Sequence, residues 1–122
     1  MFDLNNLKKA NDTLGHSVGD QLILNFARLL RNAVPSNDFV GRYGGDEFIA
    51  VIYNTTKDKV IDILRQLDKE ISEFNELGKA FKISYAHGCA FSSDYENCTL
   101  RTLFDKADKN MYNNKQAEKA GR

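Results

Sequence analysis

Apolar residues recur every three or four positions in the first third of the chain, which is the spacing of amphipathic helices. A first helix is predicted to begin after Asn5, a residue type favoured at N-caps, and to end at Gly15. A second helix is predicted from about Val18 to Ala33. The apolar stripes of these helices are Leu7, Ala10 and Leu14, and then Leu22, Ile23, Phe26, Leu29, Leu30 and Ala33.

Two more helices are predicted in the second half of the chain. Thr55 or Thr56 is expected to cap a long helix that ends at Gly78, and a last helix is expected to begin near Thr99. Each has one apolar face, which we expect to be buried. These faces consist of Val60, Ile63, Leu64, Leu67, Ile71 and Phe74, and then of Leu100, Leu103, Phe104, Ala107 and Met111.

Short stretches of strand-like residues lie between the helices. Residues 1–4 resemble the end of a strand, residues 39–40 and 48–53 flank two glycines, and residues 81–91 alternate loosely. Gly88, inside the last of these stretches, indicates a bulge or close packing. The order strand, two helices, hairpin, helix, strand, helix favours an α/β sandwich, in which helices cover a mostly antiparallel sheet.

The two glycines, Gly44 and Gly45, are followed at once by Asp46 and Glu47. Two glycines between two strand patterns predict a two-residue hairpin turn, because such turns need backbone with positive φ. Their missing side chains would also let a bulky ligand lie against the backbone. The two acids then stand at the start of the outgoing strand and face opposite ways. The alternative is a surface hairpin with two solvated acids.

Composition narrows the class of protein. The chain has 122 residues, enough for one domain with a real core, and its 17 basic and 17 acidic residues balance. Bulk charge therefore gives no indication of nucleic acid binding, and no apolar stretch or leader pattern indicates a membrane. Cys89 and Cys98 match neither a disulfide framework nor a zinc pattern. We therefore expect a cytoplasmic domain.

Carboxylates at two strand ends are the first chemical signal. Asp3 ends the first predicted strand and Asp46 follows the hairpin, so the two can meet at one edge of the sheet if these strands are neighbours. Oxygen ligands without histidine or thiolate favour Mg²⁺, whose shell is often completed by substrate phosphates. Lys8, Lys115 and Lys119 could hold such phosphates. The alternative is that these are three ordinary solvated lysines. For the lysines considered alone, this alternative is the better interpretation.

The stretch from Asn11 to Asp20 is the second chemical signal. It places two glycines and several polar side chains at a turn between two helices. The Asn11 amide can donate to guanine O6 or accept from an N–H, and the Asp20 carboxylate can accept from N1–H and the 2-amino group. The alternative is helix capping, with Asn11 near a C-terminus and Asp20 in a first turn.

Together these motifs resemble the GGDEF family of diguanylate cyclases. The resemblance rests on residues 3–12, Gly15-His16, Gly19-Asp20 and residues 42–48, and on a last helix with Ala107-Asp108, Met111-Tyr112 and Lys115. It implies a fold similar to the palm of nucleotidyl cyclases, with a ferredoxin-like βαββαβ core. It also implies condensation of two GTP molecules into cyclic di-GMP with release of two pyrophosphates. Each subunit of a homodimer would hold one GTP.

The resemblance also implies roles for single residues. Two Mg²⁺ or Mn²⁺ ions per site would be bound by Asp3 and Asp46 through carboxylates and by Leu4 through its backbone carbonyl. Glu47 would lie beside the reacting 3′-hydroxyl or help to place a metal ion. The remaining residues would hold the substrate: Asn11 and Asp20 the guanine, Lys8, Lys115 and Lys119 the phosphates, and Gly44 and Gly45 the nucleotide near the turn.

Several positions depart from the family pattern. Asn5 stands where the family usually has an acid, which would weaken the surroundings of the metal site. Ala86 and His87 replace a serine and an aliphatic residue. In the family's Arg-x-x-Asp inhibitory site, Asp38 is present but Pro35 occupies the arginine position. We therefore expect no strong product inhibition through Asp38.

The largest departure is at the front. Residues 1–122 resemble a single GGDEF domain without its usual first helix and the start of its first strand, as in a piece of a longer sensor protein. The missing segment would leave apolar surface uncovered, which favours dimerisation. Two functions are compatible with these features. One is an active cyclase, and the other is a catalytically silent module that binds GTP or a partner protein and relays a signal.

Overall fold

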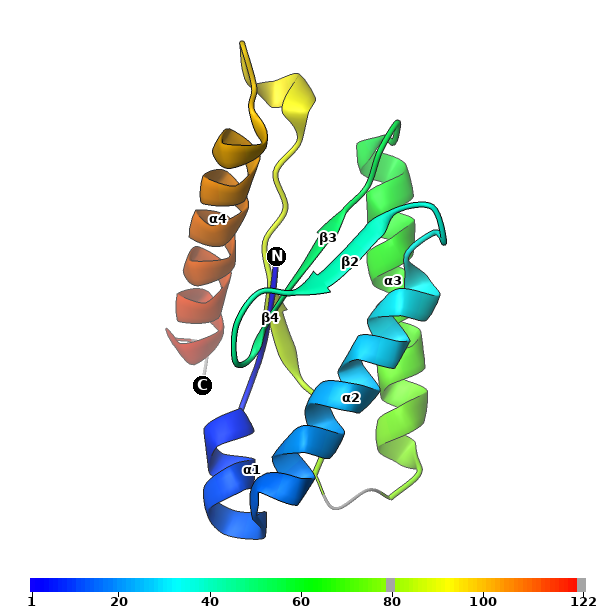
Figure 1. Cartoon of the computed structure of the whole chain (residues 1–122), viewed down its shortest axis with the longest axis vertical. Helices are drawn as coiled ribbons and strands as arrows, with labels where there is room; N and C mark the ends of the chain where they lie inside the picture. The colour runs from blue at the N-terminus through cyan, green and yellow to red at the C-terminus, as the bar shows by residue number, and fades with distance from the viewer. Residues whose placement is uncertain (79–80, 121–122) are drawn as a thin grey trace.

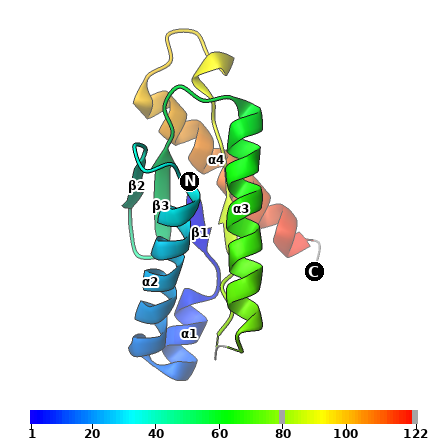
Figure 2. The same cartoon turned by 90° about the vertical axis from the view of Figure 1, so that its right-hand side faces the viewer.

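The computed structural model describes residues 1–78 and 81–120, and these form an antiparallel sheet with helices on both faces (Figures 1 and 2). The four strands lie in the order β2-β3-β1-β4. The elements in chain order are β1 (Phe2–Leu4), α1 (Leu7–Leu14), α2 (His16–Ala33), β2 (Phe39–Arg42), β3 (Glu47–Val51), α3 (Lys57–Glu76), β4 (Tyr85–His87), the short helix η1 (Ser92–Asp94) and α4 (Leu100–Ala120).

The predicted α/β sandwich is confirmed. The chain follows a βαββαβ order in which α1 and α2 together connect the first strand to the hairpin. Although β1 is short, it is central, because it pairs with β3 on one side and with β4 on the other. Residues at the end of β1 are therefore held from both sides, and this is where the sequence predicts the first metal ligand.

The sheet buries one core under each face. Helices α2 and α3 cover one face and α4 covers the other, as Figures 1 and 2 show. Aromatic rings of Phe2, Phe26 and Phe48 meet edge to face in the larger core. Its buried residues are Phe2, Leu4, Ala10, Leu22, Phe26, Leu30, Val34, Phe48, Leu67, Ile71 and Ile83, and those of the smaller core under α4 are Met1, Ala86 and Met111.

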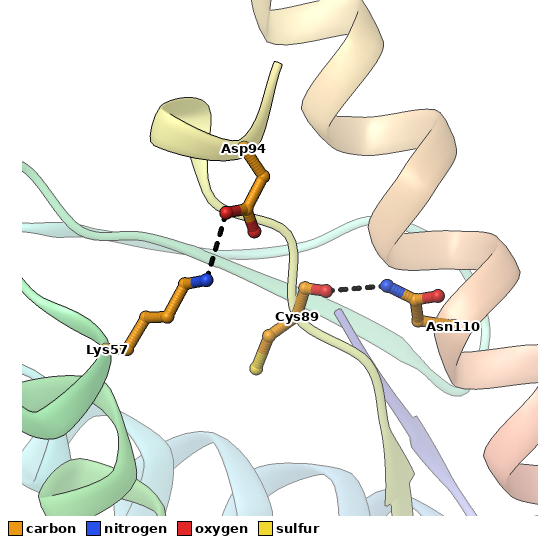
Figure 3. Close-up of polar contacts among 4 residues, drawn as sticks. All are labelled: Lys57, Cys89, Asp94 and Asn110. Carbon is orange, nitrogen blue, oxygen red and sulfur yellow. Dashed lines mark hydrogen bonds and ion pairs between the residues drawn. The ribbon is translucent and has the colours of Figure 1, made fainter.

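Close packing at Gly88 holds α4 against the sheet. A methyl group at Gly88 would lie 2.7 Å from Met111 Cα, so any side chain here would collide with the helix backbone. Two amides on α4 add to this contact: Asn110 Nδ2 donates to the Cys89 carbonyl at 2.8 Å, and Asn114 Nδ2 donates to the His87 carbonyl at 2.7 Å. Figure 3 shows the first of these bonds. Of the two roles predicted for Gly88, close packing is therefore correct.

A salt bridge fixes the loop that leads from β4 to α4. Lys57 Nζ, in the first turn of α3, lies 2.9 Å from Asp94 Oδ1 in η1 (Figure 3). Lys57 Nζ also lies 5.4 Å from the centre of the Phe91 ring. Both carboxylate and ammonium are about half exposed, so this bridge is expected to contribute little stability and mainly to place the loop.

Three details of the predicted helices are wrong. Asn5 does not cap α1, because its Nδ2 donates across the sheet to Ser84 Oγ at 3.0 Å, and Asn6 with φ of 64° precedes the helix instead. Helix α2 begins at His16 rather than near Val18, because Gly15 with φ of 93° reverses the chain in a single residue. Leu100 is 67% exposed, because it precedes the part of α4 that reaches the sheet. By contrast, the predicted cap of α3 is correct, because the Thr56 side chain accepts a hydrogen bond from the Lys59 N–H.

The last predicted strand is shorter than residues 81–91. Only Tyr85–His87 form β4. Ser84 and Gly88 still bond Asn5 and Met1 through their backbones, and beyond them side chains take the place of strand neighbours. Before β4, the Ile83 N–H donates to Asn75 Oδ1 at 2.8 Å, and the Ile83 carbonyl accepts from Asn75 Nδ2 at 2.9 Å. After β4, α4 provides donors to the backbone carbonyls. Strand propensity alone does not reveal such side-chain competitors.

The predicted two-residue turn is also wrong. Strand pairing ends at Arg42 opposite Phe48, so Tyr43–Asp46 form a wider turn, and neither glycine in it has positive φ. The Arg42 guanidinium holds this turn, because Nη2 donates to the Gly45 carbonyl at 2.7 Å and Nε donates to the Gly44 carbonyl at 3.1 Å. The Arg42 side chain therefore satisfies backbone carbonyls of the wider turn, so this turn is stable without the tight two-residue geometry.

Candidate active site

Pairing of β1 with β3 brings Asp3 beside the wide turn. Asp3 lies opposite Glu47, and the Leu4 N–H donates to the Asp46 carbonyl at 2.8 Å. The N–H and carbonyl of one strand residue point to the same side, so the Leu4 carbonyl also faces the turn. Figure 1 shows the turn, the end of β1 and the C-terminal half of α4 close to one another. We call Asp3, Asp46 and Glu47 the acidic site.

Among the described residues, Asp3 is the one charged residue that is buried. It is 7% exposed, and its Oδ2 accepts from Lys115 Nζ at 2.7 Å. Its other oxygen, Oδ1, is buried and has no hydrogen-bond partner within residues 1–78 and 81–120. Burying a carboxylate oxygen without a donor costs free energy, so Oδ1 is an acceptor ready for a cation or a donor.

Two carboxyl groups of the acidic site, those of Asp46 and Glu47, have raised pKa values. Burial raises the pKa of Asp46, and the negative charge of the adjacent Asp3 carboxylate raises it further. Burial also raises the pKa of Glu47, with further contributions from the charges of Asp3, Asp108 and Asp46. Concentrated negative charge of this kind is relieved by a bound cation.

Lys115 is the cation that the chain itself supplies. Its pKa is raised, first by the hydrogen bond to Asp3 and then by the charges of Asp3, Asp46 and Glu47, which together outweigh the opposite effect of burial. Lys115 lies on the side of α4 that Asn114 and Gly88 hold against β4. The ammonium group is therefore placed at the acidic site by the docking of a whole helix.

The donors of the acidic site fit a hard divalent cation. No group of three or more His, Cys, Asp or Glu residues is arranged to hold a metal ion in the part of the chain that the structure describes. What Asp3, Asp46 and the Leu4 carbonyl offer is a small set of oxygens around an unsatisfied buried acceptor. Mg²⁺ and Mn²⁺ suit such a set, because they keep other positions for water and phosphate.

The second predicted site lies where α1 meets α2. Asn11, in the last turn of α1, packs its side-chain amide against Gly19 in α2, and its Oδ1 is buried without a partner among the described residues. Asp20 is exposed and lines a cavity of about 490 Å³ that extends toward Arg42 and Phe48. We call Asn11, Gly19 and Asp20 the α1–α2 corner.

The other predicted residues are more open. Lys8 is exposed in the first turn of α1. A Cβ atom at Gly44 or Gly45 would meet nothing within 4 Å, so the turn leaves room for a ligand beside its backbone. Lys119 lies in the last turn of α4, and its side chain lies outside the described residues, as do Gly121 and Arg122. Of Lys8 and Lys115, the two predicted lysines whose side chains the structure describes, Lys115 is the one at the acidic site.

Sequence patterns did not reveal several residues that shape this site. Arg42 holds the turn, and the amides of Asn110 and Asn114 hold α4, although amides on a polar helix face look like ordinary surface residues. Tyr43 carries its ring to Phe104 of α4, with centroids 5.0 Å apart. In the sequence, the position of aromatic Tyr43 next to the two glycines was the one feature that indicated a contact between the turn and a helix.

Asp38 has a local structural role. Its Oδ1 accepts from the Tyr53 N–H at 3.1 Å, and its backbone carbonyl accepts from Arg31 Nη1 at 2.9 Å. Arg31 also donates to the carbonyl of Pro35. The carboxylate therefore has a backbone partner at the end of the hairpin, and the residue at position 35 presents a carbonyl in place of a guanidinium.

An apolar cavity of about 380 Å³ lies away from both predicted sites. It opens between α3 and α4, and Ile52, Leu64 and Leu103 are among the residues that line it. None of the described residues predicted to bind metal or substrate lines this cavity.

Comparison with known proteins agrees with this geometry. The family model described as "Diguanylate cyclase, GGDEF domain" matches residues 1–121. The chain belongs to the GGDEF domain family. Signaling protein YkoW of Bacillus subtilis is 40% identical over 127 aligned residues, which cover 98% of this chain and 15% of that protein. Diguanylate cyclase A of Treponema denticola is 28% identical over 118 residues, which cover 95% of this chain and 32% of that protein.

Solved structures support the same assignment. A truncated form of TpbB (also called YfiN) from Pseudomonas aeruginosa, comprising only its GGDEF domain, is 30% identical, with a TM-score of 0.79 over 95% of this chain and 69% of that one. This GGDEF domain thus spans less than a third of the two curated relatives and about two thirds of the solved domain. Within its described residues, no helix combines the length and apolar character needed to cross a membrane.

Proposed function

We propose that this GGDEF domain is a diguanylate cyclase, which condenses two GTP molecules into cyclic di-GMP. The 3′-oxygen of each GTP forms a bond to the α-phosphorus of the other, the two α–β phosphoanhydride bonds break, and two pyrophosphates leave with two protons released to solvent. Family membership supports the reaction class. The observation that carries the proposal is the buried Asp3 carboxylate beside Asp46, with one unsatisfied oxygen and one lysine contact.

The chain's own residues provide placement and charge. Asp3, Asp46 and the Leu4 carbonyl would hold two Mg²⁺ or Mn²⁺ ions, which supply charge neutralisation at the phosphates when bound. Lys115, which bonds Asp3 in this structure, would then be available to the phosphates, together with Lys8 and Lys119. Phosphoryl transfer demands in-line placement more than covalent help, and a rigid turn beside a central strand supplies it.

The nucleotide lies between the acidic site and the α1–α2 corner. Asn11 and Asp20 hold the guanine, and the open backbone of Gly44 and Gly45 accommodates the nucleotide near the turn. Glu47 faces the 3′-hydroxyl or a metal ion, and its raised pKa makes its carboxylate a better proton acceptor than an ordinary glutamate. Two subunits face each other, so the product forms across a homodimer in the cytoplasm, within a longer signalling protein with an upstream sensory domain.

One observation favours a second function, a silent module that binds GTP or a partner protein. Asn5 occupies the position of a family acid, and its amide is engaged with Ser84 Oγ at 3.0 Å, so it supports strand pairing rather than the acidic site. A domain with a depleted cation site can bind nucleotide without turning it over. Binding without product distinguishes the two functions.

The deciding experiment is GTP turnover. The purified chain is incubated with GTP and Mg²⁺, nucleotides are separated by chromatography, and Asp46→Asn serves as the isosteric control. We expect cyclic di-GMP from the wild type and none from the variant. GTP binding without product in the wild type would reject the cyclase and favour the silent module. Absence of both product and GTP binding would reject the cyclase and the GTP-binding form of the silent module, and would leave a module that binds a partner protein.

A further inference from the structure

Gly19 lies buried in the first turn of α2, directly against the side-chain amide of Asn11. A methyl group at position 19 would overlap Asn11 Oδ1 and lie 2.6 Å from Asn11 Cγ. The amide therefore occupies the space in which any other residue would place its Cβ. The contact is possible because Gly15 alone separates α1 from α2, which brings the two helices together at once.

The two ends of the Asn11 amide have different surroundings. Oδ1 is enclosed against Gly19 and has no hydrogen-bond partner among the described residues. Nδ2 is not among the enclosed polar atoms, so it remains accessible. With the oxygen inside and the nitrogen outside, Asn11 presents a hydrogen-bond donor at the α1–α2 corner. Asp20, the residue after Gly19, presents an acceptor beside it.

We infer that Gly19 is a positioning residue for base selection, because the space it leaves fixes the direction of the Asn11 amide. Donor and acceptor side by side match the O6 and N1–H edge of guanine. Adenine places a donor at the same position as O6 and lacks the N1–H, so the same pair opposes it. The inference rests on the proposed use of GTP. Its first part, that Gly19 fixes the position of the Asn11 amide, can be tested without nucleotide.

Thermal unfolding tests the packing. Gly19→Ala is made in the wild type and in Asn11→Ala, with the exposed residue change Ser17→Ala in the same helical turn as the control. Alanine favours a helix over glycine, so in the Asn11→Ala background we expect the Tm to rise by about 3 °C. In the wild type the methyl must displace the amide, and we expect the Tm to stay or fall. The same change in both backgrounds would overturn the inference.

Base selectivity tests the positioning. In equilibrium binding we expect the wild type to prefer GTP over 6-thio-GTP, which has a weak acceptor in place of O6, by about tenfold. Gly19→Ala should reduce this preference to near one, while the preference for GTP over ITP, which depends on Asp20 and the 2-amino group, stays. When Gly19→Ala is added to the Asn11→Ala variant, neither of these two preferences should change. Equal loss of both preferences in the wild-type background would mean a general structural role and overturn the inference.

These outcomes separate the inference from the proposed function. A wild-type chain that binds no GTP contradicts the proposed function, whereas the two Tm differences still decide whether Gly19 places the amide. A chain that binds GTP and shows no coupling between positions 11 and 19 contradicts the inference and leaves the proposed function in place.

Discussion

The acidic site and the α1–α2 corner are built in opposite ways. Lys115 and Asp3 are 112 positions apart, and their contact requires β1 to pair with β3 and β4 while α4 docks on the sheet. Asn11 and Gly19 belong to consecutive helices joined by a single glycine. The acidic site therefore depends on the whole fold, whereas the α1–α2 corner depends on one local turn. Changes that loosen tertiary packing should remove the first and spare the second.

The largest effect is expected from Gly88→Ala. The added methyl group meets the backbone of α4, which cannot move like a side chain, so we expect a loss of about 2–4 kcal/mol in the free energy of unfolding and no turnover. Thermal unfolding and amide NMR spectra measure both consequences. Shift changes should cluster at β1, β4 and α4, and equally large changes at Asn11 and Gly19 would contradict the separation of the two sites.

Lys115→Met should have the next largest effect. Without its ammonium group, Asp3 keeps a partly buried charge with no cation, and we expect a loss of about 2 kcal/mol in metal-free buffer. Because the pKa of Lys115 is raised, the stabilisation is present near neutral pH, where Asp3 is ionised, and is lost as pH rises through the raised pKa.

The matched control for Lys115 is Lys109→Met, an exposed lysine on the same helix. Added Mg²⁺ should restore part of the lost stability to Lys115→Met, because the ion takes over the Asp3 carboxylate. Chemical denaturation with and without Mg²⁺ measures this. A loss that is equal for both lysines would show that the contact with Asp3 contributes nothing.

Asp46→Asn should raise stability while it removes turnover. The pKa of Asp46 is raised in the folded chain, so its ionised form costs folding free energy near neutral pH, and removing that charge should increase the Tm in metal-free buffer by about 2 °C. The advantage should fade as pH falls through the raised pKa, since wild-type Asp46 is then neutral as well. Glu73→Gln, an exposed acid on α3, is the control.

The smallest effect is expected from Asp38→Ala, which should lower stability slightly and leave product inhibition unchanged. Its carboxylate accepts from the Tyr53 N–H, so stability should fall by about 1 kcal/mol. Sensitivity of turnover to added cyclic di-GMP should not change, because Pro35 stands at the position where the family's inhibitory site has its arginine. Turnover assays across product concentrations test this. Strong inhibition in the wild type that disappears in the variant would contradict it.

What the sequence predicted follows the same division between local and distant contacts. Helix α3 with its Thr56 cap and the apolar stripe of α2 were predicted correctly, because helical spacing and capping are local. The central position of β1 could only be stated as a condition, and it decides whether Asp3 and Asp46 meet. The turn was wrong because Arg42 satisfies its carbonyls, and the last strand was too long because Asn75, Asn110 and Asn114 take the place of strand partners.

The distance in sequence between Asp3 and Lys115 has a consequence during synthesis. The ribosome makes the strand with Asp3 first, and the helix with Lys115 is added only after 112 further residues. Until then neither the second core nor the lysine is available, although β3 and β4, the strand neighbours of β1, have already been made. A nascent chain of this domain can form its α1–α2 corner early, but it completes its acidic site only when the last helix has emerged.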